Sequence, residues 1–256
     1  MMFNVLTIPA FDDNYIWLIN DSQSNRAVVV DPGDAAPVLA RLSAQSLTLD
    51  AILITHHHHD HTGGVEALLT EYPNAKVFAK QALFATTTLV DEGDQVSLFD
   101  DRLQLKVWQV AGHTLDHIAY FNEQMLFCGD TLFSAGCGRI FEGTVTQMHS
   151  ALSRLATLPA QTKVYCAHEY TQNNLTFAVH VDPDNKDLID YVQHVAKLRQ
   201  QGLPSVPTTI EQEIAINPFL RCFDQSLINN LQNLLAKPIT QGEECFKALR
   251  HFKDNF

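Results

Sequence analysis

The chain has 256 residues, of which 46% are hydrophobic and 18% are charged, as expected of one large domain or of a domain with an appendage. Acidic residues outnumber basic ones by 29 to 17, which disfavours a nucleic-acid-binding protein because such a protein needs a basic face. The sequence has neither the ~20 consecutive apolar residues of a membrane-spanning helix nor a secretory signal at its start, so we expect a cytoplasmic protein that does not bind membranes.

The first two thirds of the chain alternate strand-like and helix-like patterns. Strands are predicted at residues 3–8, 15–20, 27–31, 51–55 and 76–79. Helices are predicted at residues 35–42 and roughly 64–71. Further along, we expect two or three strands within 95–110, a hairpin from 117–121 and 125–130, a helix over 146–158 and a strand at 163–167.

From about residue 171 the pattern becomes helical only. Helical spacing covers 184–202, 227–235 and 243–252, and Thr208 with Glu211 is predicted to cap one more helix. Strands with intervening helices, followed by helices alone, indicate an α/β sheet domain with a helical appendage. We therefore expect a domain boundary near residue 170.

The stretch "AILITHHHHDHTGG" (51–64) places five histidines around Asp60, in a loop between a predicted strand and a predicted helix. Because side chains alternate along an extended segment, His56 and His58 point to the same side and can bind one ion together. Asp60 and His61 follow where the chain turns into the helix. Four ligands from one short loop would struggle to close around a single ion, so we expect two adjacent ions that are completed from elsewhere.

Three more ligand-type residues stand just beyond apolar strands. His113 follows "LKVWQVAG", Asp130 follows "MLFCG" and His168 follows "KVYCA". A lone histidine in such a position is usually solvated or hydrogen-bonded to a neighbour. Here three such residues accompany the dense histidine loop, and strand ends gather at one rim of a sheet, so the pattern predicts a site for two metal ions.

The motif "THHHHDHTGG" resembles the THxHxDH signature of the metallo-β-lactamase superfamily. Within it, the chain resembles the glyoxalase II (hydroxyacylglutathione hydrolase) family over nearly its whole length. The segments that carry this resemblance are "PAFDDNYIW" (9–17), "GHTLDHIAYF" (112–121), "FCGDTLFSAGCGRIFEGT" (127–144), "CAHEY" (166–170), "INPFLR" (216–221) and "RHFK" (250–253). The resemblance implies an αββα metallo-β-lactamase-like sandwich, with a catalytic domain at 1–170 and a helical substrate-binding domain at 171–256.

The resemblance also implies how the ligands divide between two divalent metal ions. One ion would be bound by His56, His58 and His113, the other by Asp60, His61 and His168, and Asp130 would bridge both. The ions would be zinc (Zn2+), with iron and manganese as alternatives. His57 and His59 fall on variable positions of the signature and are not expected to bind metal.

The activity implied is the hydrolysis of S-(2-hydroxyacyl)glutathione, chiefly S-D-lactoylglutathione, to glutathione and D-lactate, the second step of methylglyoxal detoxification. Two cations can hold a water, lower its pKa towards ~7 and present hydroxide to the thioester carbonyl. The expected catalytic carboxylates are Asp130, between the ions, and Asp60, which can orient the hydroxide or accept its proton.

Covalent catalysis is not expected. Neither Cys128 nor Cys137 has an obvious His–carboxylate pair beyond the metal ligands, and the sequence has no GxSxG motif. The five cysteines form no CxxC motif, so we expect them to be buried, reduced thiols.

The same resemblance places the glutathione thioester on a further set of side chains. They are Arg139, Phe141, His168, Tyr170, Arg250 and Lys253. Arg250 and Lys253 share a helix face by their spacing, and an acidic protein needs such local positive charge to bind carboxylates. The family carries Lys-x-Tyr where this chain has "RIF" (139–141), so the charge is kept and a phenolic hydroxyl is lost. We expect a monomer.

Other functions remain open on the same fold: a lactonase, another thioesterase, a β-lactamase, a nuclease or a persulfide dioxygenase. The charge balance disfavours a nuclease, and a dioxygenase would need one iron and fewer ligands at the second site. A non-catalytic metal-binding module is a different class. It is disfavoured because seven ligands that leave room for water do not form a closed structural site.

Overall fold

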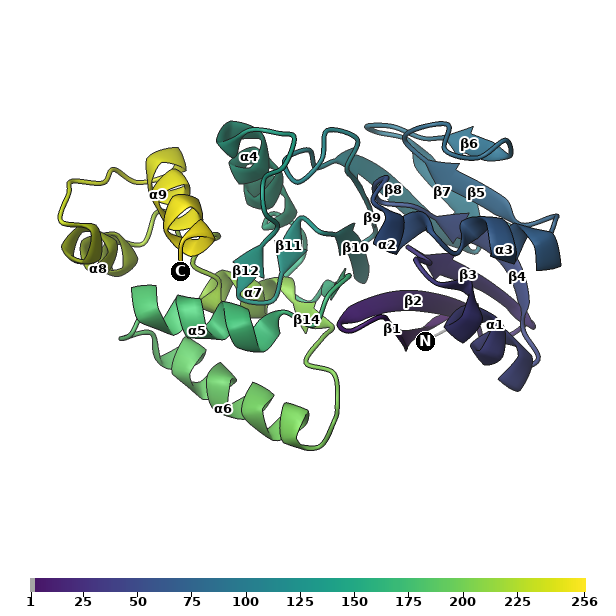
Figure 1. Ribbon diagram of the computed structural model, residues 1–256, viewed down its shortest axis with the longest axis horizontal. Coiled ribbons are helices and arrows are strands. Elements are labelled where there is room, and N and C mark those ends of the chain that lie inside the picture. Colours follow the sequence, from purple (N-terminus) through teal and green to yellow (C-terminus); the bar gives the residue numbers. More distant parts are fainter. Residues whose placement is uncertain (1–2) are drawn as a thin grey trace. The chain divides into compact units, whose positions relative to one another are not determined.

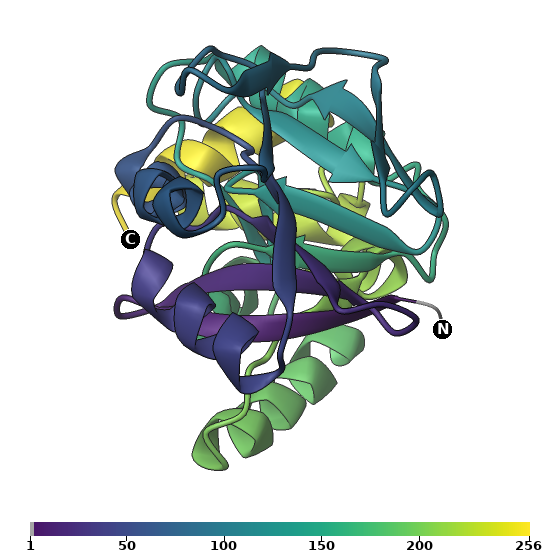
Figure 2. The same cartoon turned by 90° about the vertical axis from the view of Figure 1, so that its right-hand side faces the viewer.

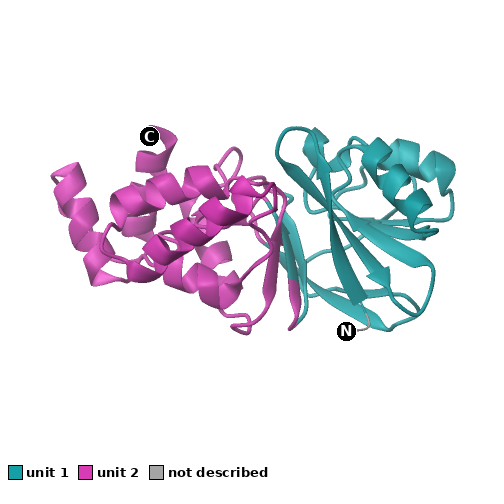
Figure 3. Cartoon of the chain, turned by 90° about the horizontal axis from the view of Figure 1, so that it is seen from below, with its two compact units in different colours: residues 1–109, 116–122, 126–129 teal, residues 110–115, 123–125, 130–256 magenta. Residues whose placement is uncertain are grey.

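A computed structural model describes residues 3–256 of the protein, and the chain divides into two compact units (Figure 3). The first unit contains the chain up to residue 109 together with 116–122 and 126–129, and the second contains 110–115, 123–125 and 130–256. The stretch from 110 to 130 is therefore shared between the units. The two predicted ligands within it, His113 and Asp130, both belong to the second unit.

Six strands of the first unit form a mixed sheet in the order β1-β2-β3-β4-β5-β6 (Figure 1). They are β1 (Phe3–Ala10), β2 (Asn14–Asp21), β3 (Arg26–Val30), β4 (Thr48–Leu53), β5 (Lys76–Ala79) and β6 (Thr87–Leu89). Strands β1 to β3 are antiparallel neighbours, whereas β3 to β6 are parallel. Because parallel strands end at the same edge of a sheet, the residues that follow β3 and β4 meet there. This topology places Asp31 beside the histidine loop.

Within residues 3–109, the first unit has three helices: α1 (Ala35–Ala44), α2 (His59–Thr62) and α3 (Val65–Glu71). Helix α1 begins after Asp34, whose carboxylate accepts a hydrogen bond from the Ala36 amide. Helices α1 and α3 lie on one face of the first sheet (Figure 2), where Val38 and Leu68 are fully buried in its apolar core. Burying one such side chain contributes roughly 1.5–3 kcal/mol, so this core fixes the end of β4 from which the histidine loop starts.

A second set of strands in this unit is antiparallel. It consists of β7 (Gln95–Leu98), β8 (Leu103–Gln109), β9 (Ile118–Phe121) and residues 126–129 of β10 (Met125–Gly129). The predicted hairpin of β9 and β10 is confirmed, since Tyr120 pairs with Phe127. The Tyr120 hydroxyl lies 3.0 Å from the carbonyl oxygens of both Ile54 and Phe78, so it fastens the second set of strands to residues at the ends of β4 and β5.

The second unit is mainly helical. Its strands are β11 (Leu132–Phe133), β12 (Gly136–Cys137), β13 (Lys163–Cys166) and β14 (Thr208–Thr209), and its helices are α4 (Val145–Leu155), α5 (Thr171–Val181), α6 (Lys186–Gln200), α7 (Ile210–Ile216), α8 (Gln225–Leu235) and α9 (Glu243–Asp254). Strand β11 pairs with β12, and β13 pairs with β14. Leu175, Leu188 and Ile216 join α5, α6 and α7 in one apolar core. Among the described residues, no helix is long and apolar enough to cross a membrane.

The cap of α7 differs from the sequence prediction. Thr209, and not Thr208, is the capping residue, because its hydroxyl accepts a hydrogen bond from the Gln212 amide. Thr208 instead pairs with Val164 of β13. Strand pairing therefore carries the extended chain one residue further before the helix begins.

Candidate metal centre

The histidine loop after β4 brings several ring nitrogens together within the first unit. His56 and His61 are buried, and His58 and Asp60 are partly exposed. Nε2 of His56 lies 3.0 Å from Nδ1 of His58, near the ~3.3 Å expected of two nitrogens that bind one ion tetrahedrally at ~2.0–2.1 Å. The ring centroids of His56 and His61 are 4.1 Å apart. Alternation along the extended chain therefore places His56 and His58 as predicted.

Asp31 holds this loop, and sequence reasoning misses it. Its buried carboxylate accepts hydrogen bonds from the Thr55 amide at 2.8 Å, the Thr55 hydroxyl at 2.7 Å and Nδ1 of His61 at 2.9 Å. Because a carboxylate only accepts, the proton of a neutral His61 ring lies on Nδ1, which leaves the Nε2 lone pair for a metal ion. The only signal for this role is the position of Asp31 at the end of a strand parallel to β4.

The other residues of the loop have distinct surroundings. The Asn14 amide donates a hydrogen bond to Oδ2 of Asp60 at 3.0 Å. Nδ1 of His57 lies 2.9 Å from Oδ1 of Asp116, and His59 is exposed. A Cβ atom on Gly33 would lie 1.9 Å from the Asp60 carbonyl oxygen, so only glycine permits this close approach of the two loops.

The second unit brings together His113, Asp130 and His168, which are all buried. Nε2 of His113 lies 3.4 Å from Oδ2 of Asp130, and Nε2 of His168 lies 3.3 Å from Oδ1. Each carboxylate oxygen therefore faces one imidazole, at the separation expected of two ligands on one ion. Nδ1 of His113 lies 2.7 Å from the carbonyl oxygen of Arg139 and can only donate to it, which again leaves Nε2 for a metal ion. These side chains fit a carboxylate that bridges two ions.

Glycine is also required beside Asp130. A Cβ atom on Gly138 would lie 1.9 Å from the Asp130 carbonyl oxygen, and the Gly138 amide donates a hydrogen bond to the Thr131 carbonyl at 3.1 Å. The segment after β12 therefore lies directly against the segment before β11. This contact couples the position of Asp130 to that of the neighbouring Arg139.

Three predicted substrate residues lie next to this cluster. The Tyr170 and His168 rings stack, with centroids 4.6 Å apart, and the Phe141 ring meets the His113 ring edge-on at 5.1 Å. Phe141 is 61% exposed and the Arg139 side chain is 63% exposed. These aromatic rings and this cation are thus accessible to a ligand that approaches His113 and His168.

Arg250 and Lys253 lie one turn apart on α9. Arg250 is buried: Nη1 donates to the Cys137 carbonyl at 3.1 Å, and Nε and Nη2 donate to Oδ1 of Asp254 at 3.1 and 2.8 Å. Nε of Arg139 lies 3.9 Å from the same oxygen. Burial and the neighbouring Arg250 charge lower the pKa of Lys253 to about 8. The three cations predicted to bind carboxylates are therefore grouped around Asp254.

The five cysteines of the chain are all free and buried, as predicted. Cys137, which lies near Asp130 and beside Arg250, is a poor candidate for a nucleophile. Burial raises the pKa of the Cys137 thiol, although the Arg250 guanidinium beside it acts in the opposite direction. A buried thiol with a raised pKa is a weak nucleophile at neutral pH, because the thiolate is the reactive form.

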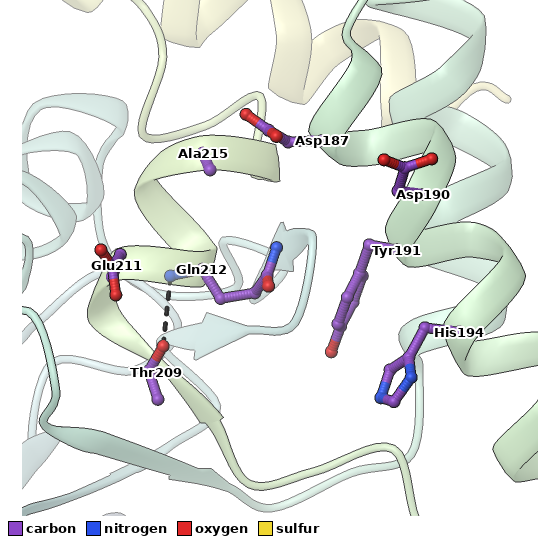
Figure 4. Close-up of a pocket in the computed structure, with 8 residues that line it drawn as sticks. All are labelled: Asp187, Asp190, Tyr191, His194, Thr209, Glu211, Gln212 and Ala215. Carbon is purple, nitrogen blue, oxygen red and sulfur yellow. Dashed lines mark hydrogen bonds between the residues drawn. The ribbon is translucent and has the colours of Figure 1, made fainter.

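A separate cavity of about 610 Å³ opens between α6 and α7 (Figure 4). Asp187 and Asp190 approach it from α6 and Glu211 from α7, with Tyr191 and His194 further along α6. Its lining includes no predicted metal or substrate residue. Three carboxylates at one cavity repel an anionic ligand, so this cavity is not suited to a substrate that carries carboxylates.

Comparison with known proteins supports the family resemblance of the sequence over the whole chain. Residues 10–168 match the metallo-beta-lactamase superfamily, and residues 169–256 match the hydroxyacylglutathione hydrolase C-terminus. The hydroxyacylglutathione hydrolases of Psychromonas ingrahamii and Photobacterium profundum are 59% and 52% identical to this chain, each over 100% of both sequences. The crystal structure of ETHE1 from Myxococcus xanthus is 27% identical, with a TM-score of 0.64, over 99% of this chain and 98% of that one. The predicted αββα sandwich with a helical C-terminal part is confirmed.

Proposed function

Because the chain belongs to the hydroxyacylglutathione hydrolase family of the metallo-β-lactamase superfamily, and is thus a metal-dependent thioester hydrolase, we propose that it converts S-D-lactoylglutathione to glutathione and D-lactate at a two-metal site. The observation that carries the two-metal proposal is the surroundings of Asp130. Its two oxygens lie 3.4 and 3.3 Å from Nε2 of His113 and of His168. One oxygen for each imidazole suits a carboxylate placed between two cations.

The proposed ligands are those of the family signature. One ion would be held by His56, His58 and His113 and the other by Asp60, His61 and His168, and Asp130 would serve both. The hydrogen bonds of two of these histidines support the proposal. Nδ1 of His61 bonds to Asp31, and Nδ1 of His113 bonds to the Arg139 carbonyl, so Nε2 of each ring is left to bind a metal ion. Zinc is the proposed native metal, since imidazole and carboxylate both suit it. Bound there, the ions would lower the pKa of a water towards ~7 and polarise the thioester carbonyl.

Asp60 is proposed to orient the attacking water and to accept its proton. The hydrogen bond from Asn14 to Oδ2 fixes one carboxylate oxygen, which sets the direction of the other. The leaving group is a thiol with an ordinary pKa of ~8.5, so its departure needs no strong general acid. The proposal therefore assigns the protein no separate general acid.

Residues 171–256 are proposed to form the substrate-binding domain, beside a catalytic domain of residues 1–170. The net charge of −12 repels an anionic substrate, so the cations of Arg139, Arg250 and Lys253 are needed to bind the carboxylates of glutathione. Tyr170 supplies a ring and a hydroxyl, whereas Phe141 supplies an apolar ring only. We further propose that the protein acts as a monomer in the cytoplasm.

The proposal is tested by comparing the hydrolysis of S-D-lactoylglutathione, a simple lactone and a β-lactam by the zinc-loaded protein. We expect the glutathione thioester to be preferred by orders of magnitude and Asp130→Asn to lose most of that activity. His194→Ala, an exposed histidine on α6, is the matched control and should retain it. A higher kcat/KM for the lactone would replace the proposal with a lactonase.

A further inference from the structure

The tip of the β11–β12 hairpin is held by polar side chains of the helical part of the chain. Oε2 of Glu213 accepts a hydrogen bond from the Ala135 amide at 2.9 Å. The Asn217 amide nitrogen lies 3.1 Å from the Phe133 carbonyl and 2.9 Å from the Gly136 carbonyl. A third side chain, Asn174 of α5, donates to the Ser134 carbonyl at 3.0 Å. Glu213 and Asn217 both come from the region of α7, which lies near β12 in Figure 1.

These contacts form one connected group inside the protein. Glu213, Asn217 and Asn174 are all buried, and the Asn217 side chain also donates to Oε2 of Glu213 at 3.0 Å. Burying a carboxyl group costs free energy that an apolar residue would avoid. In this position the carboxyl group accepts a hydrogen bond from the Ala135 amide, which an apolar side chain cannot do.

The hairpin needs such support because it is too small to hold its own shape. Each strand has only two residues, and isolated two-stranded hairpins are at best marginally stable in water. Ala135, at the tip, has a φ of 56°, in the left-handed region that a residue with a side chain rarely adopts. External hydrogen bonds must therefore maintain this conformation.

The two ends of the hairpin lead to both parts of the proposed site. Asp130 stands two residues before β11, and Arg139 stands two residues after β12. The Gly138 amide bonds the Thr131 carbonyl at 3.1 Å, so the ends are fastened to each other. A shift of the tip therefore moves the proposed bridging carboxylate and the proposed carboxylate-binding guanidinium together.

We propose that Glu213 and Asn217 are positioning residues: through the β11–β12 hairpin they set the place of Asp130 for metal binding and of Arg139 for binding the glutathione carboxylate. This inference rests on the roles proposed above for those two residues. It adds that the helical part of the chain acts on the metal site as well as on the substrate, without supplying a ligand.

The test compares Glu213→Ala and Asn217→Ala with the conservative Glu213→Gln, which keeps an acceptor oxygen. Leu231→Ala is the matched control, because it leaves a cavity in the buried face of α8 without removing any of the hydrogen bonds to the hairpin. Bound metal per chain is measured after dialysis against a weak chelator, and KM and kcat are measured on S-D-lactoylglutathione. Thermal unfolding of each variant verifies that it is folded at the assay temperature.

After the dialysis both alanine variants should retain at most roughly a tenth of the wild-type metal, and their KM should rise several-fold, since each loses a buried hydrogen bond to the hairpin. Glu213→Gln and Leu231→Ala should retain wild-type metal content and KM. If Glu213→Ala does not fold, Asn217→Ala and Asn174→Ala provide the same test.

Alanine variants with wild-type metal retention and KM would overturn the inference, as would equal losses in Leu231→Ala. Metal content is measured without substrate, so it separates this inference from the proposed function. A wild type that holds two ions but does not hydrolyse the thioester would refute the function alone.

Discussion

Glu213 is a buried carboxyl group, and burial raises its pKa to about 7 from an ordinary 4.5. The groups that face it come from every neighbouring element: Ser134 and Ala135 of the hairpin, Cys166 of β13, Tyr191 of α6, Thr208 of β14 and Asn217 after α7. None of these carries a positive charge that would favour the carboxylate form. Below pH 4.5 the group is neutral in both the folded and the unfolded chain, whereas between pH 4.5 and about 7 only the unfolded chain ionises. Glu213 therefore lowers the stability of the fold as the pH rises through this window.

Glu213→Gln should remove this loss of stability. Relative to the wild type, its free energy of unfolding is expected to rise by up to about 3 kcal/mol between pH 4 and pH 8, with no further gain above that. The measurement is urea unfolding of both proteins across this range, in which all other titrating groups cancel in the difference. A difference that stays constant with pH would show that the Glu213 pKa is not raised.

Asp31 is expected to control metal affinity although it is not a proposed ligand. Asp31→Ala removes the acceptor for Nδ1 of His61, and loss of such a partner typically weakens metal binding by about 10–100-fold. Asp50→Ala is the control, because Asp50 lies on β4 but pairs with Arg26 and does not contact the histidine loop. Chelator competition on the two variants provides the comparison, and equal affinities would remove Asp31 from the site.

At this scale the sequence predicts residues that belong to a local pattern and misses those that act across the fold. His56, His58 and Asp60 are recognisable because they stand in one short motif after an apolar strand. Asp31 lies 24 residues before its partner Thr55 and reaches it only because β3 and β4 are parallel neighbours. Glu213 lies 78 residues from Ala135, and no periodicity in either segment indicates that they meet.

At the scale of elements, α9 illustrates what helical spacing can and cannot predict. The spacing places Arg250 and Lys253 on one face, and the structure adds that Arg250 also bonds the Cys137 carbonyl while its guanidinium lies 5.3 Å from the Phe219 ring. Truncation of Arg250 therefore removes packing and hydrogen bonds together with charge. Lys253→Ala is the cleaner test of substrate binding, and Arg250→Ala should in addition lower thermal stability.

Lys253 should give the reaction an alkaline limit. With a pKa of about 8 its ammonium is present below that pH and is lost above it, so affinity for a carboxylate falls as the pH rises. We expect kcat/KM for S-D-lactoylglutathione to decline above pH 8 in the wild type. In Lys253→Ala this decline should be absent. A small thioester without the peptide is the control substrate and should show no such limb in either protein. The same alkaline limb in Lys253→Ala would assign it to another group.

The short elements are those that the sequence does not predict. Strands β11 and β12 have two residues each, too few for any period to be visible. The turn between them is held by the buried side-chain amides of Asn174 in α5 and of Asn217, directly after α7. Longer elements such as β8 and α6 carry their own alternating or helical pattern and lie where that pattern predicts. Local pattern thus predicts the scaffold, while tertiary contacts determine the turn that positions Asp130.

At the scale of the whole molecule, the negative net charge and the local group of cations are expected to act in opposite directions on an anionic substrate. A net charge of −12 repels anions in general, and the three cations around Asp254 are proposed to bind the carboxylates of the substrate. The charge balance is visible in the composition alone. The grouping of all three cations is not, because Arg139 lies more than a hundred residues before Arg250 and only the fold brings Arg139 to Asp254.

The metal centre is the other property of the whole chain, because its proposed ligands come from segments between residues 56 and 168. The wild type should contain two ions per chain, and Asp130→Ala should lose most of both, since it removes the one carboxylate that is proposed to serve each ion. Asp60→Ala removes a proposed ligand from one ion only, so this variant should retain the second ion better than Asp130→Ala does. Metal analysis after gel filtration gives the number of ions per chain in the wild type, in Asp130→Ala and in Asp60→Ala. His194→Ala is the control and should contain as much metal as the wild type. One ion in the fully loaded wild type, or equal retention by the Asp130 and Asp60 variants, would be incompatible with a bridging role for Asp130.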